Sequence, residues 1–399
     1  MTGKKNFLSP NALFRYMVLH KLRDLKKSVK ITDPWGQTVL GSGEVEGQIN
    51  VKTQAFYRDI IWKGGLGLAE SWIRHGWDTP DLTALLRTFI RNQQAIDRFK
   101  SGLSFLARHA ASRKHRKRSN TLLGSKLNIH NHYDLGNEFF SLILDETMTY
   151  SGGIFPSGES TLKDASISKL DKICQMLNLQ PNDSLAEIGC GWGSFAIHAA
   201  RNYRCRVTCI TISPNQYDYV MKRILKEKLG NQINVKLLDY RKFSGQFDKL
   251  VAIEMIEAVG YEHLPTFFRK CEKLLSPDGK MVLQGITLPH ERYKSYLKQV
   301  DFIQKYIFPG GCLVSLETIQ EHISQYTSLR IDKVRNIGND YARTLRCWRA
   351  NFWEQESNIR AQGYTEEFMR IWHYYFCYCE AGFEEGYLDN LQILISKIK

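Results

Sequence analysis

The chain has 399 residues, of which 43% are hydrophobic, and its formal net charge is +14. This length predicts two domains, and no apolar run is long enough to cross a bilayer or to form a signal-peptide core, which favours a cytoplasmic protein. Nine cysteines without a C-x-x-C pair agree with a reducing compartment, and we predict no metal site.

The positive charge is concentrated in the first third of the chain. Residues 1–130 hold 23 Lys and Arg against 9 Asp and Glu, so their excess equals that of the whole chain. The first thirty residues predict a basic amphipathic helix, because apolar residues recur at mostly four-residue spacing: Phe14, Val18, Leu22, Leu25 and Val29. Such a helix either packs on its own domain or docks on an anionic surface, lipid or nucleic acid, and charge alone does not separate these alternatives.

The remainder of this region predicts a small α+β domain over residues 1–105. A Gly-rich, strand-like stretch covers residues 39–52, and helical patterns cover residues 66–75 and 81–99. A basic run at residues 108–118 has hardly an apolar side chain, so we interpret residues 106–127 as a solvated linker. The second domain then comprises residues 128–399.

A glycine-rich loop is the most informative feature of the second domain. Residues 184–188 are an apolar run, residues 195–202 have a helical pattern, and between them stands Glu187-Ile-Gly-Cys-Gly-Trp-Gly-Ser194. Gly189, Gly191 and Gly193 let the backbone adopt positive φ and let a ligand approach the main chain. The spacing is not that of a dinucleotide fingerprint, and no Lys-Ser/Thr pair of a P-loop follows. We therefore predict an S-adenosylmethionine (SAM) site at the first strand-to-helix turn of a doubly wound α/β sheet.

Further β-branched runs follow this loop at residues 206–212, 233–238, 247–253 and 280–286, which predict parallel strands. Ligands of such sheets lie across the carboxyl ends of the strands. We therefore expect the ribose and methionine parts of SAM near Thr211, Ser213 and Gln216, and the adenine near Asp239 and Tyr240. The acid that usually ends the second strand is absent.

Two aromatic and polar segments precede the loop, at residues 131–140 and 144–155. Together with the loop they closely resemble cyclopropane-fatty-acyl-phospholipid synthases and the related mycolic acid methyltransferases, from about residue 128 to the C-terminus and more weakly before it. The matching motifs, in order, are Tyr133-Asp-Leu-Gly-Asn137, Met148-Thr-Tyr-Ser151, the glycine loop, Thr211-Ile-Ser-Pro-Asn-Gln216 and Asp340-Tyr-Ala-Arg-Thr-Leu345.

The resemblance implies a SAM-dependent methyltransferase fold and reaction. The cis double bond of a phospholipid acyl chain would attack the SAM methyl group, and loss of a proton would close a cyclopropane ring. The implied cofactor residues are Tyr150 and Ser151 at the methionine end, Glu187, Gly189, Gly191, Trp192 and Gly193 in the loop, Thr211, Ser213 and Gln216 at the ribose, and Asp239 and Tyr240 at the adenine.

The family holds a bicarbonate ion as general base in a pocket of Cys, Glu, His, Tyr and an Ile main chain. Glu257 matches the Glu, Ile286 the Ile and Tyr341 the Tyr, whereas Gly152 and Gln284 replace the Cys and the His. A capped helix start is the other interpretation of Glu257. Because the pocket is altered, methylation of the acyl chain without ring closure remains an alternative product.

Cys379 matches a family cysteine once suspected as a nucleophile. Methyl transfer from SAM to an alkene is a direct displacement, so we favour a packing role for this thiol. Residues 288–328 are long for a connection in this fold, and we expect this insertion to cover the substrate and to line a tunnel for the acyl chain.

The expected partners are an unsaturated phospholipid substrate and an anionic membrane surface, with the protein peripheral on the inner face of the membrane. We expect no nucleic acid, because Glu254-Met-Ile-Glu257 stands where methyltransferases of nucleic-acid amino groups carry an N/D-P-P-Y tetrapeptide. The rivals are an RNA methyltransferase anchored by the basic N-terminal part and a SAM-binding protein without turnover. A homodimer is left open, as are chain length, double-bond position and headgroup.

Overall fold

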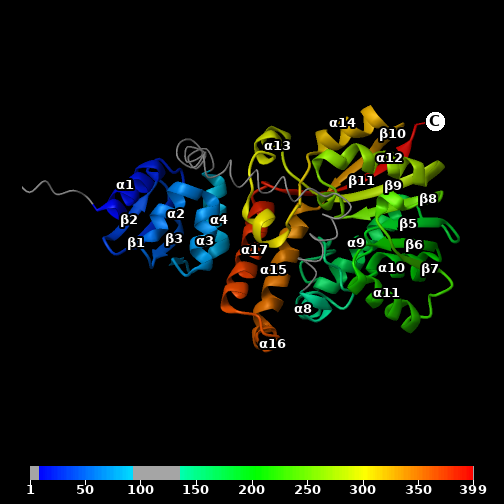
Figure 1. Cartoon of the computed structure of the whole chain (residues 1–399), viewed down its shortest axis with the longest axis horizontal. Helices are drawn as coiled ribbons and strands as arrows, with labels where there is room; N and C mark the ends of the chain where they lie inside the picture. The colour runs from blue at the N-terminus through cyan, green and yellow to red at the C-terminus, as the bar shows by residue number, and fades with distance from the viewer. Residues whose placement is uncertain (1–8, 93–134, 399) are drawn as a thin grey trace, which may run out of the picture.

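The computed structural model describes residues 9–92 and 135–398, which form an N-terminal and a C-terminal domain. The N-terminal domain lies beside the helices α15 (Gly338–Glu354) and α17 (Glu366–Glu384), which separate it from the large sheet (Figure 1). The predicted linker, residues 106–127, and motif residues 131–134 lie outside the described residues. No helix of the described ranges is both long and apolar enough to cross a membrane.

The N-terminal domain has a four-stranded sheet in the order β2-β1-β3-β4. Strand β1 pairs with β2 in antiparallel and with β3 in parallel orientation. Its elements are α1 (Pro10–Leu22), β1 (Ser28–Asp33), β2 (Gly36–Leu40), β3 (Val45–Val51), α2 (Ala55–Lys63), α3 (Gly65–Ile73), β4 (Trp77–Asp78) and α4 (Leu82–Arg91). The α+β expectation is confirmed, although α2 was not predicted.

The first helix is shorter than its pattern predicts. Ser9 caps the helix, Pro10 occupies its first turn, and it ends at Leu22, so Val29 lies on β1 instead. Val18 and Val29 are both fully buried in the core of the domain. Arg15 forms an ion pair of 2.6 Å with Asp33. The apolar face of α1 therefore packs on its own domain, which was one of the two alternatives.

The C-terminal domain is built on a seven-stranded sheet in the order β10-β11-β9-β8-β5-β6-β7. Strands β7, β6, β5, β8 and β9 run parallel, and β11 is antiparallel to both of its neighbours. The strands are β5 (Ser184–Ile188), β6 (Arg206–Thr211), β7 (Ile233–Leu237), β8 (Phe247–Ile253), β9 (Leu275–Thr287), β10 (Leu329–Asn336) and β11 (Asp389–Lys397). The five predicted strands are confirmed, and β9 begins five residues earlier than its apolar run.

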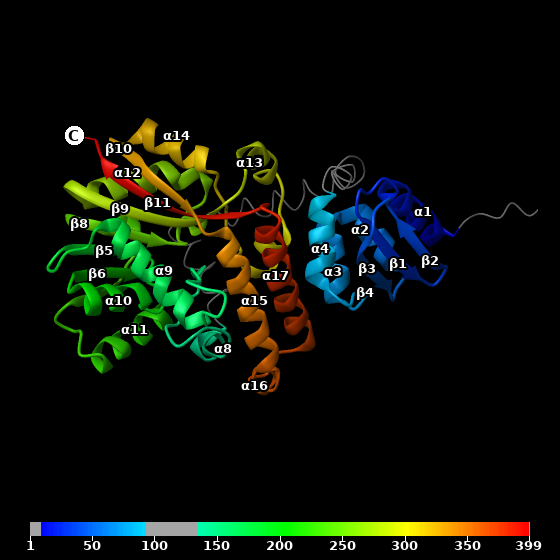
Figure 2. The same ribbon diagram turned by 180° about the vertical axis from the view of Figure 1, so that it is seen from behind.

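Helices cover both faces of this sheet. One hydrophobic core joins the strands to α9, α10 and α11, and another joins them to α12 and α14. Figure 2 shows α15 and α17 side by side beyond one end of the strands, between the sheet and the N-terminal domain. The helices are α8 (Gly136–Ile143), α9 (Leu162–Leu177), α10 (Ser194–Tyr203), α11 (Pro214–Lys226), α12 (Leu264–Leu274), α13 (His290–Tyr296), the π-helix η5 (Ile303–Ile307), α14 (Leu316–Tyr326) and α16 (Glu356–Ala361), with short 3-10 turns η2 (Tyr240–Lys242), η3 (Ile256–Ala258) and η4 (Tyr261–His263).

The two domains are joined through α17. The Arg370 guanidinium lies 3.9 Å from the centre of the Trp72 ring and donates to the Trp72 carbonyl at 2.7 Å. At the other end of the contact, Arg87 and Arg91 of α4 form ion pairs with Glu385 at 2.6 and 2.8 Å. Stacked and paired arginines at both ends fix the N-terminal domain against α17.

Candidate active site

The glycine loop has the backbone that the sequence predicts. Gly189, Gly191 and Gly193 all have positive φ, at 83°, 51° and 82°. A Cβ on Gly193 would lie 3.0 Å from Val220, whereas a Cβ on Gly191 would meet no atom of the described residues within 4 Å. Gly191 therefore presents bare backbone to open space, which is the arrangement that an adenosyl group needs.

The described part of the Tyr-Asp-Leu-Gly-Asn motif contacts this loop directly. The Trp192 indole N–H donates to the Asn137 side chain at 2.7 Å, and the Trp192 ring lies 4.9 Å from that of Phe140 on α8. Ser194, which opens α10, donates to the Thr147 carbonyl at 2.6 Å. Hydrogen bonds and ring packing therefore hold the glycine loop against α8 and against the segment before Met148.

The residues after the second strand form a local network. The Thr211 hydroxyl donates to the Gln216 side chain at 2.8 Å and accepts from the Ser213 backbone N–H at 3.1 Å. Ser213 caps α11, since its hydroxyl accepts from the Gln216 backbone N–H. The predicted trio is thus brought together, with Thr211 and Gln216 in the cavity wall and Ser213 behind them as a cap.

The predicted adenine residues follow β7. Both carboxylate oxygens of Asp239 bind the Arg241 guanidinium, at 2.6 and 2.8 Å. The Tyr240 ring packs edge-on against Phe267, and its buried hydroxyl has no hydrogen-bond partner in the part of the chain that the structure describes. An unpartnered buried hydroxyl in a cavity wall is able to bind a polar ligand.

A buried acid and a buried base lie beneath the loop. Burial raises the pKa of Glu187 to about 8 and lowers that of Lys169 to about 8, although each group's charge opposes the other's shift. Lys169 donates to the Ser151 hydroxyl at 2.8 Å, and within residues 9–92 and 135–398 one Glu187 carboxylate oxygen has no hydrogen-bond partner. Lys169 was missed from the sequence, where its only signal is a lysine on the apolar face of a helix.

One cavity of about 820 Å³ joins most of the predicted site residues. Its wall includes thirteen of them: Tyr150, Ser151, Gly189, Gly191, Trp192, Thr211, Gln216, Asp239, Tyr240, Glu257, Ile286, Tyr341 and Cys379. Five others stand behind the wall: Gly152, Glu187, Gly193, Ser213 and Gln284. The residues present fit an adenosyl cofactor with an apolar chamber beyond it.

Glu254 occupies the centre of the predicted base pocket, and the sequence analysis assigned it no catalytic role. One carboxylate oxygen accepts from the Gly152 backbone N–H at 3.0 Å, the Gln284 amide at 2.9 Å and the Asn390 amide at 2.6 Å. The other accepts from the Tyr341 hydroxyl at 2.9 Å. The sequence does contain an indication of this role, because residues 254–257 hold two acids directly after β8.

This arrangement does not fit a bicarbonate ion in the predicted pocket. The donors that the ion would need, Gly152, Gln284 and Tyr341, are all bound to the Glu254 carboxylate. A Cβ on Gly152 would lie only 2.9 Å from the Tyr341 ring, so the space of the family cysteine is also taken. A carboxylate of the chain itself fills the anion position.

Glu257 binds the main chain of Ile286, the other residue that the resemblance assigns to the bicarbonate pocket. The Ile286 backbone N–H donates to one Glu257 oxygen at 2.5 Å, and the other oxygen is buried without a hydrogen-bond partner among the described residues. Burial, and then the neighbouring Glu254 charge, raise the pKa of Glu257 to about 8. Glu257 therefore has the properties of a neutral carboxyl group beside the Glu254 carboxylate.

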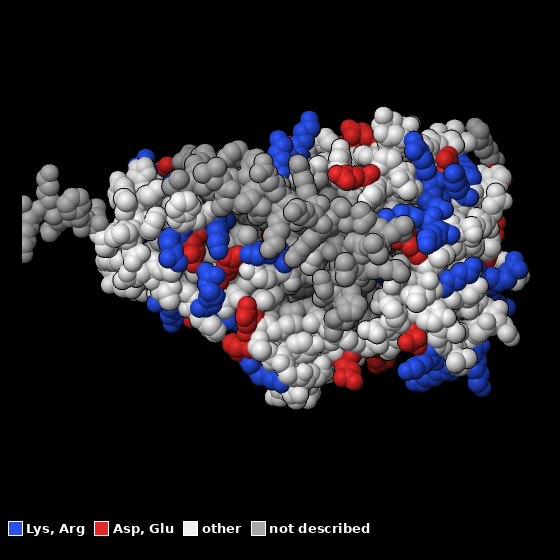
Figure 3. Space-filling view, viewed as in Figure 1, with Lys and Arg blue, Asp and Glu red and all other residues white. Residues whose placement is uncertain are grey.

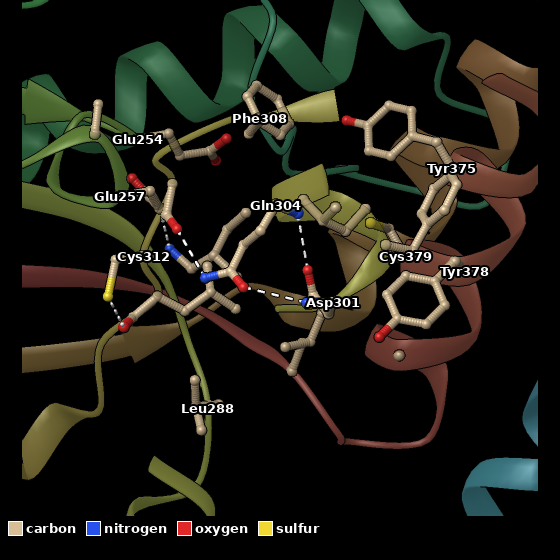
Figure 4. A pocket seen from close by; sticks show the side chains of 18 of the residues that line it. Glu254, Glu257, Leu288, Asp301, Gln304, Phe308, Cys312, Tyr375, Tyr378 and Cys379 are labelled. Carbon is tan, nitrogen blue, oxygen red and sulfur yellow. Dashed lines mark hydrogen bonds between the residues drawn. The ribbon is translucent and has the colours of Figure 1, made fainter. Parts of the chain in front are cut away.

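The insertion and α17 close the other side of the cavity. Figure 4 shows Glu254 and Glu257 on one side, Tyr375, Tyr378 and Cys379 on the opposite side, and Asp301 and Gln304 between them. Phe302 packs on Tyr374 with ring centres 4.7 Å apart. Burial raises the pKa of the Cys379 thiol, which disfavours the thiolate that a nucleophile requires.

The mycolic acid cyclopropane synthetase family matches residues 123–393. The tuberculostearic acid methyltransferase UfaA1 of Mycobacterium tuberculosis is 34% identical over 86% of this chain and 81% of its own. The cyclopropane-fatty-acyl-phospholipid synthase of Escherichia coli is 32% identical over 89% of both chains. The solved structure of mycolic acid cyclopropane synthase CmaA1 with SAH and CTAB matches with a TM-score of 0.64 and 32% identity, over 68% of this chain and 98% of its own.

Proposed function

Because the chain belongs to the mycolic acid cyclopropane synthetase family and is a SAM-dependent C-methyltransferase, we propose that it methylates the cis double bond of an unsaturated phospholipid acyl chain and closes a cyclopropane ring. The observation that carries this proposal is one cavity that runs from the bare backbone of Gly191, past the Glu254 carboxylate, to apolar walls. SAM would supply an electrophilic methyl group at this place.

The phospholipid substrate is supported by how far each relative extends along the chain. The Escherichia coli enzyme, named for a phospholipid substrate, aligns over 89% of this chain, whereas the mycolic acid synthase CmaA1 aligns over 68% of it and 98% of its own. The additional N-terminal part is therefore shared with the phospholipid enzyme. A domain that mycolic acid synthases lack fits a membrane lipid as substrate.

The chemistry assigns a proton acceptor to the site. An alkene is a weak nucleophile and its methylated product is a carbocation, so the reaction needs a water-poor cavity and a base near the transferred carbon. Glu254 lines the cavity. Its carboxylate accepts four hydrogen bonds from the described residues, and the oxygen that binds the Tyr341 hydroxyl accepts one of them. We assign proton removal to this oxygen, in the place that the resemblance gives to bicarbonate, with Glu257, Gln284 and Tyr341 as positioning residues.

The remaining site residues have cofactor roles in this proposal. Lys169 and Ser151 would meet the methionine end, and the Gly189–Gly193 backbone would cradle the adenosyl group. Glu187 is buried at the start of the loop, and Trp192 joins the loop to α8 through its hydrogen bond to Asn137. Cys379 has no chemical role, since its thiol packs in the wall.

A second product is favoured by one observation. The base pocket differs from the bicarbonate pocket at Gly152, Gln284 and Glu254, and the similar UfaA1 is named a methyltransferase. Removal of a proton from the neighbouring chain carbon, instead of the new methyl group, would leave a methylated alkene. With SAM carrying a deuterated methyl group, ring closure retains two of the three deuteriums, and the methylated alkene retains all three.

Membrane docking is proposed to use the basic N-terminal domain at the inner face of the membrane. The apolar face of α1 is buried, so docking would rest on exposed charges and not on insertion of this helix. Basic side chains are visible on both domains in Figure 3. Arg23→Glu with Lys26→Glu should therefore weaken sedimentation with anionic liposomes, whereas Lys222→Glu with Lys226→Glu on α11 should have a smaller effect.

A labelling experiment with the purified wild-type protein tests the two rivals, an RNA methyltransferase and a SAM-binding protein without turnover. Purified protein is mixed at equal salt with bulk RNA or with vesicles of unsaturated anionic phospholipid, together with SAM that has a labelled methyl group. Label in acyl chains and none in RNA is the expected result. Label in RNA, or SAM binding without transfer to lipid, would reject the proposed function.

A further inference from the structure

The active-site cavity does not stop at the catalytic domain. The same cavity is also lined by residues of the N-terminal domain, which come from α1, β1, β3, α2, α3 and α4. They include Leu22, Ile49, Ile60, Leu86, Phe89 and Ile90. We call this part of the cavity the N-terminal chamber.

The N-terminal chamber is apolar throughout this set of residues. Leu86 and Ile49 belong to the buried core of the domain, and Ile60, Phe89 and Ile90 are partly buried against it. Water gains few hydrogen bonds in a space with such walls, so apolar cavities stay dry and bind apolar ligands. The occupant must therefore be a hydrocarbon group.

The wall of the same cavity also has a polar corner in the N-terminal domain. Lys63, Gly64 and Gly65, where α2 ends and α3 begins, line the cavity here, and a Cβ on either glycine would meet no described residue within 4 Å. The corner is thus both unobstructed and beside a charged side chain.

The charges at this corner favour an anion. Lys63, and Lys305 from the insertion, both bind the buried Glu70 carboxylate of α3. Arg74 pairs with the neighbouring Asp59 at 2.6 Å. Two carboxylates, Glu70 and Asp59, are surrounded by four basic side chains: Lys63, Lys305, Arg58 and Arg74.

We propose that the N-terminal chamber holds the second acyl chain of the diacyl phospholipid, the chain that is not methylated, while the first chain lies beside Glu254. This inference rests on the proposed phospholipid substrate. The two chains of such a lipid leave adjacent carbons of one glycerol, so they require two apolar spaces that meet at a polar junction. The cavity provides both spaces, and the basic corner at Lys63 faces the phosphate.

The contact between the domains makes this arrangement a fixed one. Arg370 stacks on the Trp72 ring and donates to the Trp72 carbonyl, and Arg91 forms an ion pair with Glu385. These contacts hold the N-terminal chamber against α17. Lys305 adds a third link, from the insertion to Glu70. A lipid that occupies both spaces would therefore bind across the two domains of one chain.

Photo-crosslinking of the full-length wild-type protein tests the proposal directly. The probe is a phospholipid with an unsaturated chain and with a diazirine near the end of its saturated chain. The expected result is label in peptides of residues 10–91. Label confined to residues 135–398, or no label above a detergent-only control, would overturn the proposal.

A filling substitution gives a second measurement. Leu86→Trp places a larger ring in the N-terminal chamber, and Val39→Trp, at a position 54% exposed on β2, is the matched control. Excluding two methylene groups costs about tenfold in affinity, so Leu86→Trp should raise KM for the diacyl lipid about tenfold or more and reduce the crosslink equally. SAM affinity should stay unchanged in both variants.

The outcomes separate this inference from the proposed function. If KM and crosslink of Leu86→Trp equal those of Val39→Trp while the wild type converts phospholipid, the second-chain site is wrong and the function stands. If the wild type binds SAM but converts no phospholipid, the proposed function itself fails.

Discussion

The Tyr341 hydroxyl donates a hydrogen bond of 2.9 Å to the Glu254 carboxylate, from a helix that begins more than eighty residues further along the chain. Three amide donors hold the other oxygen of the same carboxylate. Glu254 itself has a φ of 48°, which an L-residue rarely adopts. So many constraints on one side chain at a cavity wall point to a functional role.

Glu254→Gln removes the proposed proton acceptor and keeps the size of the side chain. A positioned general base contributes typically about 10²- to 10⁴-fold, so the single-turnover rate should fall by about that much. SAM affinity, measured by calorimetry, should remain close to that of the wild type. Added bicarbonate should not restore the rate, because Gly152 and Tyr341 leave no space for the ion.

Glu262→Gln, an exposed change on η4, is the matched control and should leave the rate unchanged. The loss of a general base should far exceed a change of about twofold in rate. If the rate of Glu254→Gln lies within about twofold of this control, Glu254 is not the base.

Gly191→Val should abolish SAM binding. Its φ of 51° disfavours a branched side chain, and a Cβ there projects into the open space where the cofactor is expected. Gly158→Val, at an exposed glycine with equally open space, controls for the added side chain. Calorimetry with SAM and circular dichroism together decide: unchanged SAM affinity in a folded Gly191→Val protein contradicts the assignment.

Gly152→Cys should destabilise the protein, and we do not expect it to restore a bicarbonate pocket. From the sequence, Cys at 152 with His at 284 would be expected to raise ring formation or bicarbonate dependence. The structure changes this expectation, because a Cβ at 152 would lie 2.9 Å from the Tyr341 ring and 3.1 Å from the Asn390 amide. Overpacking of this kind costs about 1–3 kcal/mol.

Chemical denaturation measures this cost, with Gly158→Cys as the control for a new thiol. A Gly152→Cys protein as stable as the control, or one whose turnover becomes bicarbonate-dependent, would show that Tyr341 and Glu254 move aside easily.

Glu257→Gln should become more stable relative to the wild type as the pH rises from about 4.5 to about 8. Burial raises the pKa of Glu257 to about 8, so over this range the unfolded chain releases a proton that the folded chain keeps. Wild-type stability therefore falls with rising pH, and the amide, which cannot ionise, avoids this loss. Below the unfolded pKa this effect disappears.

Thermal melts across this pH range test the prediction, with Glu159→Gln as an exposed control. A Tm difference between Glu257→Gln and wild type that does not depend on pH would mean that Glu257 is ionised in the folded protein.

The strands of the catalytic domain were predictable because buried parallel strands are continuous apolar runs, and the glycine loop because its spacing has few other uses. The end of α1 was not predictable. Val29 continues the four-residue spacing of the helix, but it reaches the same core from β1, and spacing alone does not separate the two. The spacing of apolar residues therefore predicts which residues are buried in the core, but it does not decide whether each lies on a helix or on a strand.

The candidate site was predictable where a role belongs to a local motif and not where it depends on distant parts. Gly191 and Thr211 lie where their motifs predict. Glu254 was missed because its function depends on the missing Cβ of Gly152 and on Tyr341 and Asn390, which approach it from other elements. The sequence shows that Gly152 replaces the family Cys. It does not show that the Glu254 carboxylate binds there.

The proposed function depends on Glu254 as an internal base for methyl transfer to a phospholipid acyl chain. The most direct measurement is turnover of unsaturated phospholipid vesicles by the wild-type protein in buffers freed of carbon dioxide and in buffers with added bicarbonate, with proton NMR of the lipid product. We predict equal rates in both buffers and cyclopropane ring protons in the product. A rate that falls when bicarbonate is removed, or lipid that gains no carbon, would contradict this account.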